Sequence, residues 1–156
     1  MASPGTFPDL FAAPVLDSAI ARIHRLTPES HPVWGQMTVA QMLAHLCVSY
    51  EMVYSTKHPR PNVLMRWVLK RIVKDRVIND VPYAQGTPTA PAFRITDARD
   101  FALERERLVG YLRQVQADGR AAFEGRASLS FGPLTAAEWN ALFSKHLDHH
   151  LRQFGV

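Results

Sequence analysis

The stretch T-A-A-E-W-N-A-L-F-S-K-H-L-D-H-H-L-R-Q-F, residues 135–154, decides the fold. Thr135 followed three positions later by Glu138 is typical of a capping box, in which each side chain bonds to the other residue's backbone N–H. Gly155 stands just after the stretch, where glycine favours the end of a helix. The sequence therefore predicts a helix over residues 136–154.

This helix is expected to have an apolar face that carries two histidines. With about 100° between successive residues, His146 and His150 lie within about 20° of Trp139 on that face. Gln153 extends the same row, and His149 lies at its edge. Imidazoles on a buried face need hydrogen-bond partners or a shared ion, because an unpaired buried polar group is costly.

Another helix is expected over residues 13–26, where Leu16, Ile20 and Ile23 recur with the helical period. Pro28 closes this segment, because the residue before a proline is biased away from helical backbone.

A third helix is expected over residues 39–56, because Thr38 and Gln41 form a second capping-box pattern before an apolar run. His45 lies within the apolar stripe of this helix. Cys47 faces away from His45, so we expect it to be neither a ligand nor a nucleophile.

A fourth helix is expected over residues 98–117, with Asp97 as its N-cap and Gly119 as its end. Four amphipathic helices around one core are typical of a helix bundle. We therefore expect an all-α protein, a four-helix bundle in which residues 1–156 form a single domain.

The connection before residue 98 is long. Residues 62–78 combine apolar and basic side chains and are compatible with an extra helix, whereas the proline-rich residues 79–95 are expected to form a loop. Loops of this length are often lids or binding loops, and Tyr83 is a candidate pocket residue within it. Residues 127–131 are the one short stretch with strand-like alternation.

The composition is that of a globular protein, with 47% hydrophobic and 21% charged residues in a chain of 156. Cys47 is the only cysteine, which excludes an internal disulfide and a cysteine-based zinc site. Residues 1–11 lack the basic flank and apolar run of a signal peptide, and no apolar run approaches about 18 residues. We expect a cytoplasmic protein without a membrane span. The net charge of +4 permits an anionic partner but does not require one.

The histidines have the spacing of a metal site. Imidazoles four residues apart on a helix are neighbours and can chelate one ion, as His146 and His150 would. His45 from a facing helix would complete a three-nitrogen site, which leaves coordination positions open as in catalytic centres. Imidazole suits Zn, Ni, Cu or Fe. Alternatively, each histidine is a buried core residue with hydrogen bonds of its own.

Two motifs carry a resemblance to a known family. W-G-Q-M-T-V-A-Q-M-L-A-H at 34–45 and K-H-L-D-H-H-L-R-Q-F-G at 145–155 resemble those of the DinB-like superfamily, and the likeness covers nearly the whole chain. Within that superfamily, F-G-P-L-T-A-A-E-W at 131–139 is similar to an uncharacterised branch. A His-Pro pair often precedes the Phe-Gly in that branch, and Leu129 and Ser130 stand there in this chain.

The resemblance implies a four-helix bundle that binds a divalent metal, Ni or Zn, through His45, His146 and His150. Better-understood members of the superfamily resemble thiol S-transferases and thiol-dependent isomerases that use a low-molecular-weight thiol. Many members resemble proteins that form homodimers, so the likeness also implies a homodimer. His149 and Gln153 would then support the ligand imidazoles.

Three hypotheses follow. The first is a metal-dependent enzyme that activates a thiol or water toward a small-molecule substrate; Glu104 would orient a ligand imidazole or else form a surface ion pair with Arg105 or Arg107. The second is a non-catalytic binding or regulatory protein stabilised by its metal. In the third, residues 62–78 bind an anionic membrane or phosphates, unless they simply pack as an extra helix or a dimer contact. No nucleic-acid recognition motif accompanies that segment, and we expect no nucleic-acid partner.

Overall fold

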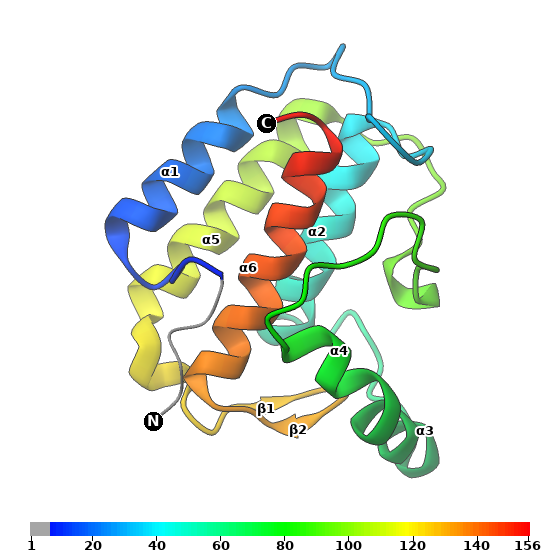
Figure 1. The fold of residues 1–156 in the computed structure, drawn as a ribbon, viewed down its shortest axis with the longest axis vertical. Coiled ribbons are helices and arrows are strands. Elements are labelled where there is room, and N and C mark those ends of the chain that lie inside the picture. Colours follow the sequence, from blue (N-terminus) through cyan, green and yellow to red (C-terminus); the bar gives the residue numbers. More distant parts are fainter. Residues whose placement is uncertain (1–6) are drawn as a thin grey trace.

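The computed structural model describes residues 7–156, and its four long helices pack side by side (Figure 1). In chain order they are α1 (Ala13–His24), α2 (Val39–Tyr54), α5 (Phe101–Phe123) and α6 (Ala136–Gln153). This arrangement confirms the expected all-α bundle. Residues 1–6 lie outside the described part, so the expected domain extent of 1–156 and the expected lack of a signal peptide stay predictions.

Both expected capping boxes are present. Gln41 N donates to Thr38 Oγ1 at 3.2 Å, and Thr38 N donates to Gln41 Oε1 at 3.0 Å. Thr135 and Glu138 form the same pair at the start of α6. The helices end slightly before the expected residues 26, 56 and 154, at His24, Tyr54 and Gln153. In α1 and α6 the reason is that the last turn tightens into bonds three residues apart.

The predicted start of α5 at residue 98, with Asp97 as its N-cap, is wrong. The N-cap is Asp100, whose carboxylate accepts a hydrogen bond from Leu103 N at 2.8 Å. Asp97 instead forms an ion pair with Arg99. Both aspartates fit the capping preference, and the Arg99 side chain draws Asp97 away from the helix.

The expected stop at Gly119 is present as a break in α5, where the backbone is non-helical with a φ of 77°. What the sequence did not predict is that helical backbone resumes after the break and continues to Phe123. A left-handed φ costs glycine little, so the residue forms a kink. The resumed turn buries Phe123 against Trp139 and Phe143 of α6, and this contact accounts for the continuation.

Helix α2 packs against α5 and α6 and is buried from Val39 to Glu51, apart from the half-buried Gln41. Its Cys47 side packs against α5, with the Sγ atom 3.9 Å from Glu104 O, while His45 faces α6. Burial raises the pKa of Cys47 to about 12. The thiol is therefore protonated at neutral pH and is a poor nucleophile.

A buried ion network joins α2 to α5 on the side away from His45. Arg107 bonds to the carboxylates of both Glu51 and Glu104, which are almost fully buried. Arg99 adds a bond to Glu104 at 3.3 Å. Within the described part of the chain, the Glu104 carboxylate bonds to arginines and to none of the three candidate histidines. The expected ion pair between Glu104 and Arg107 is therefore present, although the Glu104 carboxylate is buried and not on the surface, and the alternative that Glu104 orients a ligand imidazole is wrong.

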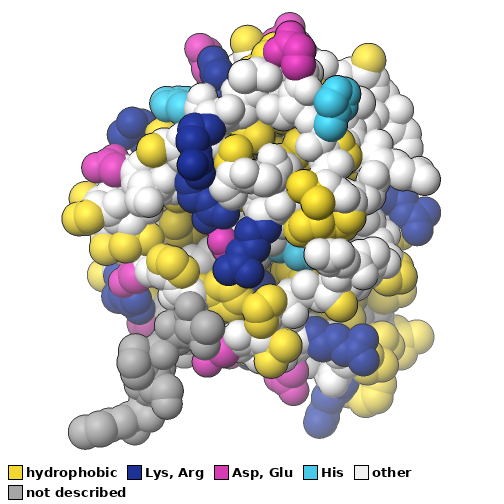
Figure 2. Space-filling model, turned by 45° about the horizontal axis from the view of Figure 1, so that its top comes forward, with side chains coloured by type: hydrophobic (Ala, Val, Ile, Leu, Met, Phe, Trp, Pro, Cys, Tyr) yellow, Lys and Arg dark blue, Asp and Glu magenta, His cyan; other side chains and the backbone are white. Residues whose placement is uncertain are grey.

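Residues 62–78 form a helical arm beside the bundle, as expected. It consists of α3 (Val63–Val68), the π-helical turn η1 (Leu69–Val73) and α4 (Lys74–Ile78). One side packs on the bundle through Leu69, Val73 and Val77. The other side exposes large apolar residues, namely Val63, Leu64, Met65, Trp67 and Ile72. In Figure 2 hydrophobic and basic side chains lie together at the lower right, over this arm.

A buried lysine attaches the arm to α6. Lys145 Nζ donates to Arg76 O at 2.6 Å, to Asn79 Oδ1 at 2.7 Å and to Asn79 O at 3.3 Å. These carbonyls lie at the carboxyl end of α4, where a positive charge is favourable. A second attachment is the ion pair between Lys74 and Glu138 at 2.9 Å.

The remaining connections contain little regular secondary structure. The loop after α4 contains one 3-10 turn, η2 (Pro91–Phe93), and then leads to α5. Strand β1 (Ala127–Ser128) pairs antiparallel with β2 (Gly132–Pro133), so the strand-like character expected at 127–131 holds for two of its residues. Within residues 7–156, no helix is long and apolar enough to cross a membrane.

Candidate metal centre

The structure brings His45 of α2 together with His146 and His150 of α6. One ring nitrogen from each histidine lies within 4.8 Å of the other two. His45 and His150 are buried and His146 is half-buried, and all three border a cavity. The ring centroids are 4.5 to 5.0 Å apart, and the rings meet edge-on.

Packing between α2 and α6 fixes the height at which the histidines meet. Tyr50 of α2 stacks on Phe143 of α6 with ring centroids 4.7 Å apart. Phe143 precedes His146 by one helical turn, and Tyr50 follows His45 by about one turn and a half. The aromatic pair therefore lies just beneath the histidines and sets the register of the two helices.

Two of the imidazoles are oriented by carbonyl oxygens. His45 Nδ1 donates to Phe93 O at 2.8 Å, and His150 Nδ1 donates to Gln153 Oε1 at 2.7 Å. Because a carbonyl oxygen can only accept, both rings carry their proton on Nδ1. Their Nε2 atoms therefore present lone pairs.

Gln153 is itself held in place. Its Nε2 donates to Trp34 O at 2.8 Å, so its Oε1 is directed at His150. The adjacent Gly35 has a φ of 86°, and a Cβ atom built there would lie 2.6 Å from Gln153 Nε2. Glycine is needed at position 35 both for its conformation and for this close approach.

His146 joins the group through both nitrogens. Its Nε2 lies 2.8 Å from His45 Nε2, and its Nδ1 lies 3.1 Å from Ser49 Oγ. Since the His45 nitrogen carries a lone pair, the contact is favourable when His146 Nε2 is protonated or when both nitrogens face one cation. The Ser49 hydroxyl can serve either case, because it donates and accepts.

Burial keeps the three imidazoles uncharged. It lowers the pKa of His45, lowers that of His146 well below its ordinary value, and lowers that of His150 to about 3. The neighbouring imidazoles lower the pKa values of His146 and His150 further. A metal ligand must be an unprotonated nitrogen, so this environment favours ligation at neutral pH.

The arrangement fits a divalent ion. Nitrogens bound to one ion at about 2.0–2.1 Å are roughly 2.9–3.4 Å apart for coordination angles from 90° to tetrahedral. The 2.8 Å between His45 Nε2 and His146 Nε2 is close to that range. Two of the three Nδ1 protons already bond to carbonyls, which is the usual support of a ligand histidine.

A cavity of about 810 Å³ borders the three histidines. Its other walls come from the arm, the loop after it, the hairpin and α6. Leu129 and Ser130 lie in the wall that the hairpin of β1 and β2 contributes. Tyr83 lines the cavity as expected, and burial raises its pKa to about 12.

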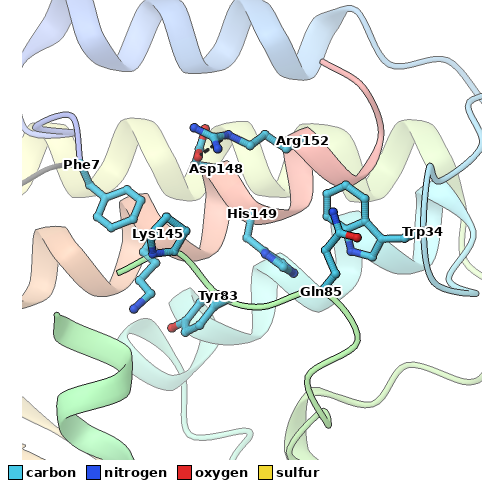
Figure 3. Close-up of a pocket in the computed structure, with 9 residues that line it drawn as sticks. Phe7, Trp34, Tyr83, Gln85, Lys145, Asp148, His149 and Arg152 are labelled. Atoms are coloured by element: carbon cyan, nitrogen blue, oxygen red, sulfur yellow. Dashed lines mark ion pairs between the residues drawn. The ribbon is translucent and has the colours of Figure 1, made fainter. Parts of the chain in front are cut away.

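His149 lies between this cavity and a smaller pocket of about 110 Å³ on the outer side. Figure 3 shows His149 pointing from α6 into the space between Tyr83 and Gln85, with Trp34 beside it. Its ring meets the His150 ring edge-on at 4.9 Å. Among the described residues, no hydrogen bond joins its side chain to the three candidate ligands.

Sequence reasoning missed two groups that hold the candidate ligands. Ser49 lies one helical turn after His45 on the same face of α2, so the helical period could have identified it. The Phe93 carbonyl carries no such signal, because the contact depends on how a long loop folds back onto α2. The proposed support of His150 by Gln153 has a geometric basis in their hydrogen bond, and its effect on a metal stays a prediction.

Fold and site together define a helical bundle whose three clustered histidines could hold a metal ion beside a cavity. The chain belongs to the family described as protein of unknown function (DUF1569), which it matches over residues 5–155. No curated protein and no solved structure matches the chain. The likeness to the DinB-like superfamily stays an expectation that rests on the motifs.

Proposed function

We propose that the protein is a divalent-metal-dependent enzyme in which His45, His146 and His150 hold the ion. The observation that carries this proposal is the convergence of three uncharged imidazoles within 4.8 Å at the wall of a cavity. Ni or Zn is the expected ion, because both accept three imidazoles and leave positions for other ligands.

A divalent cation at this site would favour the deprotonated form of a thiol or a water molecule near neutral pH. The residues of the chain have supporting tasks. Phe93 O and Gln153 orient two imidazoles, and Ser49 bonds to the third. The apolar cavity limits water around the reacting groups, which strengthens electrostatic interactions there.

The cavity supports the proposal of an enzyme over the alternative of a non-catalytic protein that its metal stabilises. Structural metal sites are usually closed by four protein ligands, whereas three ligands next to an open volume suit substrate entry. The reaction class we propose is transfer or addition of a low-molecular-weight thiol, with metal-assisted hydrolysis as the second candidate. A homodimer in the cytoplasm remains our expectation for the assembly and location.

The metal site is tested by titrating purified, chelator-treated protein with Zn²⁺ and Ni²⁺ in a calorimeter and by measuring metal content. We expect one ion per chain for the unaltered protein and at least a 100-fold weaker affinity for His146→Ala. His24→Ala is the matched control, since His24 is exposed on α1. Full occupancy in the His146→Ala protein would contradict the site.

Catalysis is tested separately with the metal-loaded protein and a panel of thiols and electrophiles, followed by product mass spectrometry. Turnover that disappears on chelation and returns with the ion would support the enzyme. If the ion binds and raises the melting temperature but no thiol transfer or hydrolysis occurs, the non-catalytic alternative is correct.

A further inference from the structure

The chemistry of the large cavity indicates what kind of molecule it binds. The cavity has a volume of about 810 Å³, and His45, His146 and His150 form part of its wall. Ligand pockets for small molecules usually measure about 300–1,000 Å³. The volume is therefore sufficient for an elongated organic molecule whose one end reaches the histidines.

Apolar side chains from every bordering element line the cavity. Met52 comes from α2, Val73 from the arm, Phe93 from the loop, Leu129 from the hairpin and Leu142 from α6. Burying apolar ligand surface against such walls is favourable at roughly 25 cal/mol per Å². The walls therefore favour the binding of a ligand with a continuous hydrocarbon or aromatic body.

The polar side chains of the walls are mostly occupied by the protein itself. Lys145 Nζ makes three hydrogen bonds to Arg76 O and Asn79 and lies 4.5 Å from the centre of the Tyr83 ring. Ser128 Oγ accepts from Phe131 N, and Trp139 Nε1 donates to Arg126 O. Few groups are left to replace the water around a strongly polar ligand.

The ordinarily charged side chains among the described residues that line the cavity are basic. Among the described residues no aspartate or glutamate lines the cavity, whereas Arg76 and Lys145 do. Arg76 is exposed at the rim and has no ion-pair partner in the described part of the chain. With a divalent ion on the three histidines, a ligand cation would be repelled by that ion as well as by Arg76 and Lys145, which is unfavourable.

We infer that the cavity binds an apolar molecule, neutral or with one negative charge, whose single electron-pair donor lies at the histidine end. The electron-pair donor of this ligand is inferred from the proposed function, on which that part of the inference rests. Its apolar body is inferred from the cavity walls. Cations and hydrophilic thiols that carry several charged groups are excluded. Such a thiol would lose its hydration without gaining partners.

The first test uses protein loaded with Co²⁺ and the series of n-alkanethiols from butanethiol to octanethiol. Thiolate binding is followed by the cobalt absorption bands. We expect the dissociation constant to fall about three- to fourfold with each added methylene, which corresponds to about 0.8 kcal/mol. No dependence on chain length, or equal binding of a tripeptide thiol with two carboxylates, would overturn the inference.

The second test needs no metal. Chelator-treated protein is titrated with n-octanol and with n-butanol, and binding is measured by calorimetry. We expect octanol to bind at least tenfold more tightly, because it buries four more methylenes against the apolar walls. Equal binding of the two alcohols would contradict the inference.

Matched variants locate the binding. Val73→Asp places a carboxylate in the cavity wall, whereas Ile72→Asp places one on the exposed side of the same π-helical turn. Octanol binding should fall at least tenfold in the first and stay within twofold in the second. Leu129→Asp in the hairpin is a second cavity variant, used if Val73→Asp does not give the helical circular dichroism of the unaltered protein. Octanol binding that survives in a folded cavity variant would overturn the assignment.

The two proposals fail separately. If no ion binds but octanol binds and Val73→Asp abolishes it, the metal centre is wrong and the apolar cavity stands. If the ion binds but alkanethiols and octanol show no preference over polar probes, the metal centre stands and the inferred ligand class is wrong.

Discussion

At the scale of single residues, the candidate centre depends on the atoms that hold the histidines as much as on the histidines. His45 and His150 each use Nδ1 for a carbonyl oxygen, so their Nε2 atoms face inward. Two different loops hold these acceptors. Phe93 lies in the loop before α5, and Gln153 is held by its hydrogen bond to Trp34 O in the loop before α2. Each imidazole is therefore oriented before any ion arrives, which lowers the entropy lost on binding.

Gln153→Ala should weaken metal binding by about 10- to 100-fold, because loss of a group that orients a ligand histidine typically has that effect. The substitution removes the acceptor for His150 Nδ1 and leaves Trp34 O without its donor. Competition against a chromophoric chelator measures the affinity. Gln153→Glu retains an acceptor for His150 and should restore most of the loss, whereas unchanged affinity in Gln153→Ala would show that this contact does not orient the ligand.

Acid should destabilise the metal-free protein through the same imidazoles. Burial lowers the pKa of His45, His146 and His150 below the ordinary value of 6.5. Below about pH 6.5 the unfolded chain binds protons that the folded chain does not, so the free energy of unfolding falls as pH falls. The slope approaches about 1.4 kcal/mol per pH unit for each imidazole. Above pH 7 the three histidines contribute no slope.

Urea unfolding with a chelator present, between pH 7.5 and 5, checks this dependence. Ordinary carboxylates titrate at about pH 4 and contribute little in that interval. His150→Gln removes one of the three groups and should make the slope shallower. A slope that is the same with and without His150 would show that its imidazole is not buried in the uncharged form.

At the scale of elements, helical periodicity and caps predicted most of the bundle. The capping boxes at Thr38 and Thr135 fixed the starts of α2 and α6, and those starts fix the faces on which His45 and His146 lie. The start of α5 was predicted wrongly because two aspartates, Asp97 and Asp100, are equally suited to cap a helix. The local sequence does not reveal that Arg99 pairs with the first of them.

Features that depend on contacts between distant segments could not be predicted from helical periodicity. The turn η1 within residues 62–78 has the composition of an ordinary helix, so its π-helical bonding was not predictable from that composition. The Phe93 carbonyl reaches His45 only because the loop folds back over α2. The two helices that carry the histidines were therefore predictable, whereas the cavity walls and part of the support were not.

Lys145→Met should loosen the arm while the bundle stays intact. The substitution keeps most of the apolar stem but leaves Arg76 O and Asn79 without their donor. Arg76 and Asn79 are exposed residues, so water can replace part of the lost bonding, and we expect a cost of about 1 kcal/mol, at the low end for unpaired acceptors. Hydrogen–deuterium exchange followed by mass spectrometry should show faster exchange in residues 74–79 and in the loop after them. Lys70→Met, on an exposed part of the same arm, is the control. Equal acceleration in α1 and α5 would point to global destabilisation instead of local opening.

At the scale of the whole molecule, α2 separates two polar centres. One side carries His45 toward α6 and the cavity, and the other carries Glu51 into the ion network with α5. The first centre is uncharged and borders the cavity, whereas the second is charged and its carboxylates bond to Arg99, Arg107, Lys57 and His58. Stability and ligand binding are thus assigned to opposite sides of the same helix.

Substitution of Arg107 should separate these two roles. Arg107→Leu leaves the buried carboxylates of Glu51 and Glu104 without their shared partner, and breaking a buried pair on one side costs about 3–5 kcal/mol. Because Arg107 is itself 29% exposed, and because Glu51 and Glu104 keep other basic partners, we expect a value below that range, roughly 2–3 kcal/mol, and a melting temperature lower by roughly 5–10 °C.

The matched control is Arg113→Leu on the exposed side of α5, which should change the free energy of unfolding by less than about 0.5 kcal/mol. Adding Glu104→Gln to Arg107→Leu should recover part of the loss, because an amide is easier to bury than a carboxylate. Metal affinity below the melting transition should be unchanged in all three proteins, since the network does not contact the histidines in the described structure. A parallel loss of metal affinity in Arg107→Leu would mean that α2 transmits changes at the network to His45, so that the two sides of the helix do not act independently.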